Sequence, residues 1–256
     1  MLLTLDIGNT NIVLGVYSPK GLLLHKWRMI SDVSKTPDDY AVDIIELFLT
    51  NKIDCLQLSG CIIASVVPRL SEILRTAVKK FFGGDVLLVG EKNVKLDIEI
   101  QLKNKSEVGA DRLINSIAAY HEFGGNLIVI DFGTATTFDV VGANGEYLGG
   151  VIAPGVNLSL KALHDMTAKL PKIAIQKQKN VIGKNTVEAM NSGVYFGYVS
   201  MVEGMIAKIE KELGVKTTQI FTGGLSELFK DELKIEHHRP DLTLEGLQLV
   251  YKINIK

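Results

Sequence analysis

The sequence predicts an α/β protein made of two similar domains, each led by a β-hairpin, with a cleft between them. Three observations carry this prediction: a hairpin pattern that occurs twice, helical segments that alternate with apolar strands, and glycines at the turns. The length of 256 residues allows one large domain or two small ones, since a domain averages roughly 150 residues. With 46% hydrophobic and 22% charged residues, the chain has the composition of a folded protein.

The repeated hairpin is the main internal feature of the sequence. Two segments share an apolar strand, an Asp-x-Gly turn and a second strand: residues 2–17 (LLTLDIGNTNIVLGVY) and residues 127–142 (LIVIDFGTATTFDVVG). Asp6 and Gly8 correspond to Asp131 and Gly133 at a constant offset of 125 positions. A Gly-led extended run follows each hairpin, at residues 21–29 and 145–153. The repeat predicts two domains, residues 1–115 and 116–256.

Helical and strand patterns alternate after the first hairpin. An amphipathic helix is predicted from Pro37 to residue 50, because Pro favours the first helical position. Continuous apolar strands at residues 59–67 and 85–89 flank a helical pattern at residues 69–80. Strands of this kind belong to a sheet that is covered on both faces.

The second half contains a long helical pattern over residues 186–213. Gly214 follows it, and glycine is the residue type that most often closes a helix. Three glycines interrupt this helix at a cost of roughly 1 kcal/mol each relative to Ala, which indicates close approach of another backbone: Gly193, Gly197 and Gly204. A strand at residues 219–222 then leads to Gly223-Gly224 and a short helix.

Charge, cysteine content and hydropathy argue against several classes of protein. The net charge of -1 gives no general attraction to nucleic acid. Cys55 and Cys61 lack metal-ligand spacing and are expected to be reduced. No apolar stretch reaches the roughly 18 residues that cross a membrane, and the N-terminus lacks a signal-peptide pattern, so we expect a cytoplasmic protein. The histidines form no ligand spacing, and His237-His238 is expected in a solvated loop.

The two Asp-x-Gly turns are candidate phosphate sites. Glycine in a tight turn lets backbone N–H groups face phosphate oxygens, and a neighbouring carboxylate can hold phosphate through Mg²⁺. Small polar side chains follow each glycine: Asn9, Thr10 and Asn11 in the first copy, and Thr134, Thr136 and Thr137 in the second. Hairpin-turn chemistry alone is the simpler alternative, but it does not explain two copies at matched positions.

Two other phosphate motifs do not fit this sequence. Gly183-Lys184-Asn185-Thr186 is similar to the end of a P-loop, but Gln178 occupies the position of the required first glycine. Asp131-Phe132-Gly133 spells the protein-kinase triplet, although no catalytic-loop motif precedes it.

Several motifs resemble those of known families. The turns Asp6 to Thr10 and Asp131 to Thr137 resemble the phosphate motifs of the acetate/sugar kinase, Hsc70 and actin superfamily. Glu107 to Arg112 (EVGADR) resembles the substrate motif of the type III pantothenate kinase family. Further segments match that family in order along nearly the whole chain: Pro154 to Val156, Ser159, Ala162-Leu163, Ala168, Leu170-Pro171, Gly183-x-Asn185-Thr186, Ser192-Gly193 and Thr222 to Gly224.

The resemblance implies two duplicated actin-like, ribonuclease H-like domains around a central cleft. It also implies ATP-dependent phosphorylation of pantothenate, the first step towards coenzyme A. The residues that would then hold ATP are Asp6, Ile7, Gly8, Asn9, Thr10, Asn11, Ile12, Val13, Thr134, Gly223 and Gly224. Asp6 would anchor Mg²⁺, and Asp131 would bind a monovalent cation, potassium or ammonium. The residues that would bind pantothenate are Gly109, Ala110, Asp111, Arg112 and Thr186.

The resemblance further implies that Asp111 is the base and that the protein forms homodimers, with Thr186 reaching the substrate from the other subunit. Ser106 is the predicted N-cap of a helix that starts at Glu107, so Asp111 falls early in this helix. A carboxylate there can interact with the helix dipole, worth ~0.3–1 kcal/mol, or accept the proton of the hydroxyl under phosphorylation. Arg112 can hold the carboxylate of pantothenate or pair with a nearby acidic residue.

One position departs from the family, and two alternatives stay open. Many members place a Tyr that contacts pantothenate seven residues before the motif glycine, where this chain has Leu102. A superfamily enzyme with another substrate, either a kinase or an exopolyphosphatase-type phosphatase, would share the turns without the EVGADR motif. A non-catalytic regulator is expected to lose one of the three aspartates that are all present here: Asp6, Asp111 and Asp131.

Overall fold

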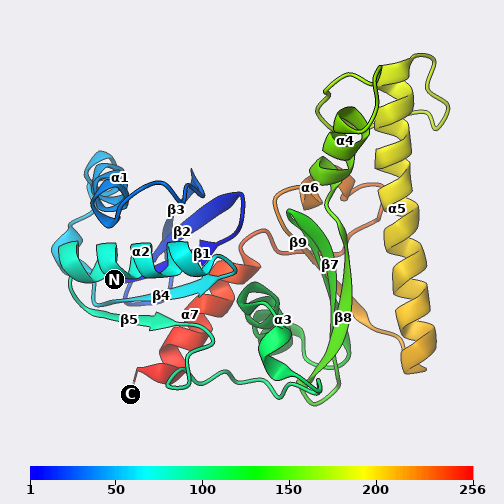
Figure 1. The fold of residues 1–256 in the computed structure, drawn as a ribbon. Helices are drawn as coiled ribbons and strands as arrows, with labels where there is room; N and C mark the ends of the chain where they lie inside the picture. The colour runs from blue at the N-terminus through cyan, green and yellow to red at the C-terminus, as the bar shows by residue number, and fades with distance from the viewer. Residues whose placement is uncertain (256) are drawn as a thin grey trace. The chain divides into compact units, whose positions relative to one another are not determined.

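The computed structural model describes residues 1–255 and divides them into two compact units. Unit 1 comprises Met1–Ile98, Lys103–Ala118 and the residues from Leu242 onward, and unit 2 comprises Glu99–Leu102 and Ala119–Asp241. This division differs from the predicted boundaries of 1–115 and 116–256, because the last helix packs on the sheet of unit 1. Each unit contains one five-stranded sheet (Figure 1).

The sheet of unit 1 has the strand order β3-β2-β1-β4-β5. Its strands are β1 (Leu2–Ile7), β2 (Asn11–Tyr17), β3 (Leu23–Ile30), β4 (Gly60–Ser65) and β5 (Asp85–Leu88). The first three form an antiparallel meander, whereas β4 and β5 extend the sheet in parallel from β1. The helical elements are α1 (Pro37–Thr50), η1 (Cys55–Gln57), α2 (Pro68–Phe81), η2 (Lys105–Glu107), the first part of α3 (Ala110–Phe123) and α7 (Leu242–Asn254).

Helices cover both faces of this sheet. Helices α1 and α2 lie on one face, and α7 with the first part of α3 lies on the other (Figure 1). Alternate residues of β4 therefore enter different cores: Cys61 and Ile63 face α1 and α2, whereas Ile62 and Ala64 face α7. Burial on both faces explains why this strand reads as a continuous apolar run.

The sheet of unit 2 has the strand order β10-β9-β6-β7-β8. Its strands are β6 (Leu127–Phe132), β7 (Ala135–Val141), β8 (Tyr147–Pro154), β9 (Thr218–Thr222) and β10 (His237–His238). Strands β6, β7 and β8 are antiparallel, and β9 and β10 continue in parallel from β6. One face is covered by α4 (Val156–Asp165), α5 (Thr186–Leu213) and α6 (Ser226–Phe229), whose core includes the stacked rings of Phe132, Tyr195 and Phe229.

The predicted repeat is confirmed residue by residue. Strands β1 and β6 have the same burial pattern, in which Asp6 and Asp131 are the partly exposed positions, and β2 and β7 also share one pattern. The turns differ in length: the N–H of Gly8 donates to the carbonyl of Asn11, whereas that of Gly133 donates to Ala135. The second turn is one residue shorter, so the offset between the copies falls by one after the turn.

Most predicted elements are present, and two local predictions are wrong. The long helix spans Thr186–Leu213 and ends at Gly214, which has a φ of 71°. Helix α3 starts at Ala110 rather than Glu107, because the Asn104 side chain caps a separate 3-10 turn in place of the predicted cap Ser106. His237-His238 forms β10 rather than a solvated loop.

Both cysteines are free thiols, as predicted, and Cys61 is buried. Burial raises the pKa of the Cys61 thiol far above its ordinary value. Among residues 1–255, no helix combines the length and the apolar character that crossing a membrane requires.

Candidate active site

The first Asp-x-Gly turn lies where β1 gives way to β2. Asp6 is partly exposed, and the side chains of Asn9 and Thr10 are exposed at the tip of the turn. Ile7 and Ile12 are fully buried in the core, so only their backbone can face a ligand. The turn therefore presents one carboxylate, small polar side chains and backbone groups, which are the groups that bind Mg²⁺ and phosphate.

Ser31 ties this turn to the loop after β3, a role that sequence reasoning missed. Its hydroxyl donates a hydrogen bond of 2.6 Å to the carbonyl of Gly8, and its N–H donates one of 3.1 Å to the carbonyl of Thr10. The pairing of β2 with β3 places Ile30 opposite Asn11, so Ser31 follows directly beside the turn. The strand register was thus the signal that could have identified Ser31.

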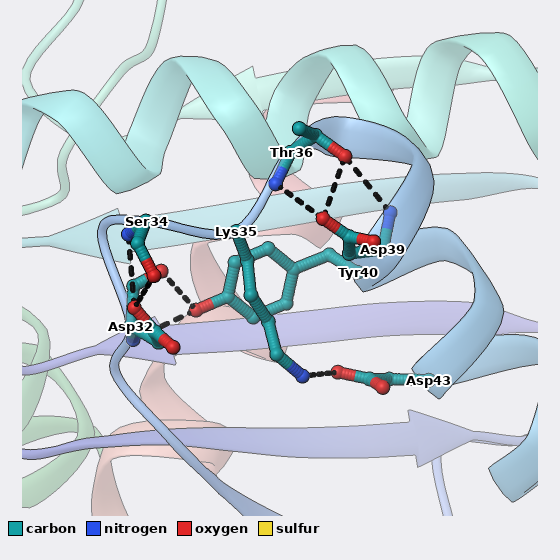
Figure 2. Close-up of polar contacts among 7 residues, drawn as sticks. All are labelled: Asp32, Ser34, Lys35, Thr36, Asp39, Tyr40 and Asp43. Carbon is teal, nitrogen blue, oxygen red and sulfur yellow. Dashed lines mark hydrogen bonds and ion pairs between the residues drawn. The ribbon is translucent and has the colours of Figure 1, made fainter.

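The loop that carries Ser31 is itself braced against α1 (Figure 2). The hydroxyl of buried Tyr40 accepts the N–H of Asp32 at 2.9 Å and donates to its carbonyl at 3.0 Å. The carboxylate of Asp32 accepts two hydrogen bonds from Ser34, which lower the pKa of Asp32. Two further contacts hold the loop on α1: the 2.6 Å ion pair of Lys35 with Asp43 and the capping box of Thr36 with Asp39.

Asp111 lies in the first turn of α3, with its Oδ1 accepting the N–H of Arg112 at 2.9 Å. Burial raises the pKa of Asp111 above its ordinary value, while the N–H and the guanidinium of Arg112 act in the opposite direction. A Cβ placed on Gly109 would lie 2.6 Å from the Oδ1 of Asp111, so glycine leaves room for this carboxylate. A carboxylate with a raised pKa is a stronger proton acceptor, as a general base requires.

The Glu107 to Arg112 segment and the first turn meet at one end of the sheet of unit 1. A Cβ placed on Gly109 would lie 3.6 Å from Cγ1 of Val66. The N–H of Val66 in turn donates a 3.0 Å hydrogen bond to the carbonyl of Ile7. Since β1 and β4 are parallel, their carboxyl ends bring the base candidate Asp111 close to the turn that begins at Asp6.

The second turn presents fewer polar side chains than the sequence predicts. Thr134 is exposed beside Asp131, which is partly exposed. Thr136 is fully buried, because alternate residues of β7 face the core. The hydroxyl of Thr137 donates to the buried carboxylate of Asp139 at 3.2 Å. Of the three threonines, Thr134 is the one that remains placed to contact a ligand.

Two glycines allow other segments to pack on the second turn. A Cβ on Gly155 would overlap the carbonyl oxygens of Gly133 and Thr134, and the N–H of Gly155 donates to Thr134 at 3.1 Å. A Cβ on Gly223 would overlap the carboxylate of Asp131, and the φ of Gly223 is 91°. The structure thus brings Asp131, Thr134 and the Gly223-Gly224 turn together in unit 2.

Thr186 and Leu102 lie in other parts of unit 2. Thr186 is the exposed first residue of α5, after Asn185, whose side chain accepts the N–H of Glu188 at 2.9 Å. Leu102 ends a segment that is hydrogen-bonded to Tyr147 of β8 through Glu99 and Gln101. A substrate role for either residue stays a prediction.

The metal ligands predicted from the sequence are single carboxylates, Asp6 and Asp131, each at the end of a strand beside a turn. One carboxylate together with substrate phosphates is a common way for proteins to hold Mg²⁺. Within residues 1–255 there is no group of three or more His, Cys, Asp or Glu side chains that could enclose a metal ion. The single carboxylate of Asp6 beside the turn fits a metal ion that is held jointly by the protein and the phosphates.

Comparison with known proteins decides the family. The sequence model of the type III pantothenate kinases matches residues 2–208. The chain belongs to this family. Type III pantothenate kinases from Moorella thermoacetica and Paramagnetospirillum magneticum are 44% and 46% identical to it. Both alignments cover 99% of this chain, with 100% and 98% of the respective relatives.

Solved structures agree with the predicted fold. A putative Baf family transcriptional activator from Campylobacter jejuni has 19% identity and a TM-score of 0.61 over 98% of both chains. A putative 2-dehydro-3-deoxygalactonokinase from Sinorhizobium meliloti has 11% identity and a TM-score of 0.60 over 99% of both chains. At these identities the similarity shows the fold alone, and it confirms the prediction of two duplicated actin-like domains.

Proposed function

We propose that this chain transfers the γ-phosphate of ATP to the hydroxyl of pantothenate, the first step towards coenzyme A. The observation that carries the proposal, beside the family membership, is the position of Asp111. A carboxylate with a raised pKa lies at the same end of unit 1 as the first Asp-x-Gly turn. A base beside a phosphate site is what phosphoryl transfer to a hydroxyl requires.

In the proposed reaction, the chain positions both reactants and accepts one proton. The turn from Gly8 to Asn11 and Thr134 hold the phosphates of ATP, and Asp6 anchors Mg²⁺. Mg²⁺, when bound, neutralises charge on the phosphates. Asp111 accepts the proton of the pantothenate hydroxyl as this oxygen attacks the γ-phosphorus in line, and the bond from the γ-phosphorus to the bridging oxygen breaks to release ADP. Arg112 holds the carboxylate of pantothenate, since a guanidinium can pair with a carboxylate through two hydrogen bonds.

The remaining assignments belong to the same proposal. Asp131 binds a monovalent cation, potassium or ammonium, and Gly223-Gly224 contacts the nucleoside part of ATP. Gly109 and Ala110 contact pantothenate through their backbone, and Thr186 reaches the same substrate from the other subunit. We further propose that the enzyme works in the cytoplasm, where ATP is made and used.

We propose a homodimer that forms through α5. Small residues recur on this helix at intervals of three or four positions, at Gly193, Gly197, Ser200 and Gly204. Apart from the nearby backbone of α5 itself, a Cβ placed on each of the three glycines would meet no atom of residues 1–255 within 4 Å. The close approach of another backbone predicted at these glycines is therefore not made by the described part of the chain. A second copy of α5 would supply it, because small residues let two helix backbones pack closely.

The direct test is ATP consumption with pantothenate, Mg²⁺ and potassium. We expect pantothenate-dependent turnover that collapses in Asp111→Asn and falls when sodium replaces potassium. Asp97→Asn, which removes an exposed carboxylate of unit 1, is the matched control and should behave as the native protein. A protein that binds ATP but never phosphorylates pantothenate would contradict the proposal. That result would favour a regulator or another substrate, with Leu102 as the first position to change.

A further inference from the structure

A serine, a histidine and a glutamate form a chain of contacts behind the Gly223-Gly224 turn. The Oγ of Ser226 lies 2.7 Å from Nε2 of His238, and Nδ1 of His238 lies 3.2 Å from a carboxylate oxygen of Glu227. The same Oγ donates a 2.7 Å hydrogen bond to the carbonyl of Gly223. All of these residues belong to unit 2, and neither the serine nor the histidine has a role in the site described above.

The directions of these hydrogen bonds follow from the chemistry of the groups. A carbonyl oxygen can only accept, so the hydroxyl hydrogen of Ser226 points to Gly223. The Ser226 oxygen then accepts from Nε2 of His238, which must carry a hydrogen. Nδ1 of His238 faces the carboxylate of Glu227.

This constellation has the residue types of a hydrolytic triad but not its function. Ser226 is 1% exposed, so a substrate cannot reach its oxygen. Its hydroxyl hydrogen is also committed to the carbonyl of Gly223, whereas a nucleophilic serine donates to the histidine that acts as its base. The contacts of Ser226 are directed at the backbone of the turn.

The turn is held from two sides. On one side Gly223 lies so close to the second phosphate turn that an added Cβ would overlap Asp131 and lie 2.5 Å from the nitrogen of Phe132. On the other side its carbonyl accepts both the hydroxyl and the N–H of Ser226, at 2.7 and 3.2 Å. His238 is fixed in turn, because β10 pairs it with Phe221 of β9.

We propose that His238, acting through Ser226, positions the Gly223-Gly224 turn for the nucleoside part of ATP. The proposal rests on the proposed function, in which this turn binds ATP. His238 and Ser226 are positioning residues and do not contact the nucleotide. The side chain of Glu227 is 71% exposed, so its contact with Nδ1 contributes little, and the hydrogen bond of the 14% exposed His238 to Ser226 carries the effect.

The test compares variants along this path by steady-state kinetics. Ser226→Ala and His238→Leu should each raise the KM for ATP about fivefold, the loss expected for one hydrogen bond, and leave the KM for pantothenate unchanged. Because both substitutions interrupt the same chain of contacts, the KM for ATP of the double variant should be no higher than that of the more affected single variant. His238→Gln keeps an N–H donor and should restore much of the ATP affinity. His237→Gln changes the neighbouring histidine, whose ring lies tilted against that of Phe123, and should leave both KM values native.

Three results would overturn the proposal: a native KM for ATP in His238→Leu, additive effects in the double variant, or an equal rise in both KM values.

A fluorescent ATP analogue, titrated without pantothenate, separates this proposal from the function on which it rests. If the native protein binds the analogue but never phosphorylates pantothenate, the proposed function fails, and weaker binding by His238→Leu still supports the positioning role. If native turnover is normal and His238→Leu binds as tightly as the native protein, the positioning role fails alone.

Discussion

Asp111 occupies a position that favours its chemistry and disfavours its charged form. Burial removes hydration from the Asp111 carboxylate. The N–H and the guanidinium of Arg112 restore only part of the stabilisation of its charged form, since the net effect is a raised pKa. A charged group in such a place destabilises the folded state, as is common for residues that serve activity. One substitution should therefore move activity and stability in opposite directions.

Asp111→Asn should lower turnover by roughly 10²- to 10⁴-fold, because the proton acceptor is lost. The same change should raise the melting temperature by a few degrees at neutral pH, since it removes a buried negative charge. Turnover and thermal unfolding of the same sample check both expectations. Asp97→Asn serves as the control for a carboxylate change on the surface. A melting temperature below the native value would show that Arg112 depends on this charge for its own stability.

The raised pKa of Asp111 also fixes the sign of two pH dependences. Turnover requires the ionised form, so it should decline on acidification at a pH above the ordinary value of 3.8. Stability behaves oppositely: the contribution of Asp111 to the free energy of unfolding is present when the group is protonated and is lost as pH rises through the raised pKa. Denaturant unfolding at several pH values should show this component in the native protein and not in Asp111→Asn.

Ser31→Ala should raise the KM for ATP about fivefold, because the carbonyl of Gly8 loses one hydrogen bond and the first turn loosens. Ser31→Thr keeps the hydroxyl and should restore the native value. Ser34→Ala is the control, since the Ser34 hydroxyl contacts Asp32 in the same loop and not the turn. An equal rise in the Ser34→Ala variant would assign the effect to the loop as a whole.

At the scale of residues, the sequence points to candidate site residues where they lie within a short motif. Asp6, Asp131 and Gly223 were predicted for this reason, and their roles stay predictions. Ser31 and His238 were not, since Ser31 contacts a residue 23 positions away and His238 reaches Ser226 across 12 positions. Such contacts depend on strand register, which a single pattern of residue types does not specify.

At the scale of elements, predictions were confirmed where the apolar residues of a segment recur at a regular spacing or where a Pro or Gly marks one of its ends. Pro37 began α1 and Gly214 ended α5 as expected. Strand β10 has only two residues, too few for any period, and its place is given by pairing with β9. The start of α3 was misplaced because Asn104 provides a capping side chain two residues before Ser106.

The start of α4 depends on the absence of a side chain at Gly155. Gly155→Ala should destabilise the protein by about 1–3 kcal/mol, because the new Cβ overlaps the carbonyls of Gly133 and Thr134 and the backbone must move. The φ of Gly155 is -76°, so alanine meets no backbone strain and the overlap alone acts. Urea unfolding measures the stability, and the KM for ATP reports the shift of the second turn.

Asn157→Ala, an exposed change in the same helical turn, is the control for Gly155→Ala and should leave both quantities close to native. If Gly155→Ala kept native stability and a native KM for ATP, α4 would not be packed on the second turn as the structure describes.

At the scale of the whole chain, the sequence predicted the repeat but not the sheet on which the last helix packs. No helix was predicted over the residues of α7, nor was its place on the sheet of unit 1. Close packing within unit 1 settles this point: a Cβ on Gly60 would overlap the hydroxyl of Tyr251, and one on Gly246 would overlap the backbone of Ile114. These contacts join residues that are 191 and 132 positions apart, which no local pattern encodes.

The last prediction concerns the assembly of two chains through the three glycines of α5. If a second copy packs on them, Gly197→Leu should insert a bulky side chain between the helices and convert a dimer to a monomer in sedimentation. Glu212→Leu, an exposed position of α5 outside the small-residue stripe, should leave the dimer intact. Turnover should fall with the dimer, because Thr186 is proposed to act from the other subunit.

The alternative makes an opposite prediction for a smaller change. On a monomer, Gly197→Ala would add a methyl group that meets nothing, and it should stabilise the helix by roughly 1 kcal/mol. In a close-packed dimer the same methyl group would separate the helices and weaken association. A native chain that sediments as a monomer, together with a more stable Gly197→Ala variant, would therefore contradict the dimer. The three glycines would then lower the stability of the helix without a compensating contact from residues 1–255.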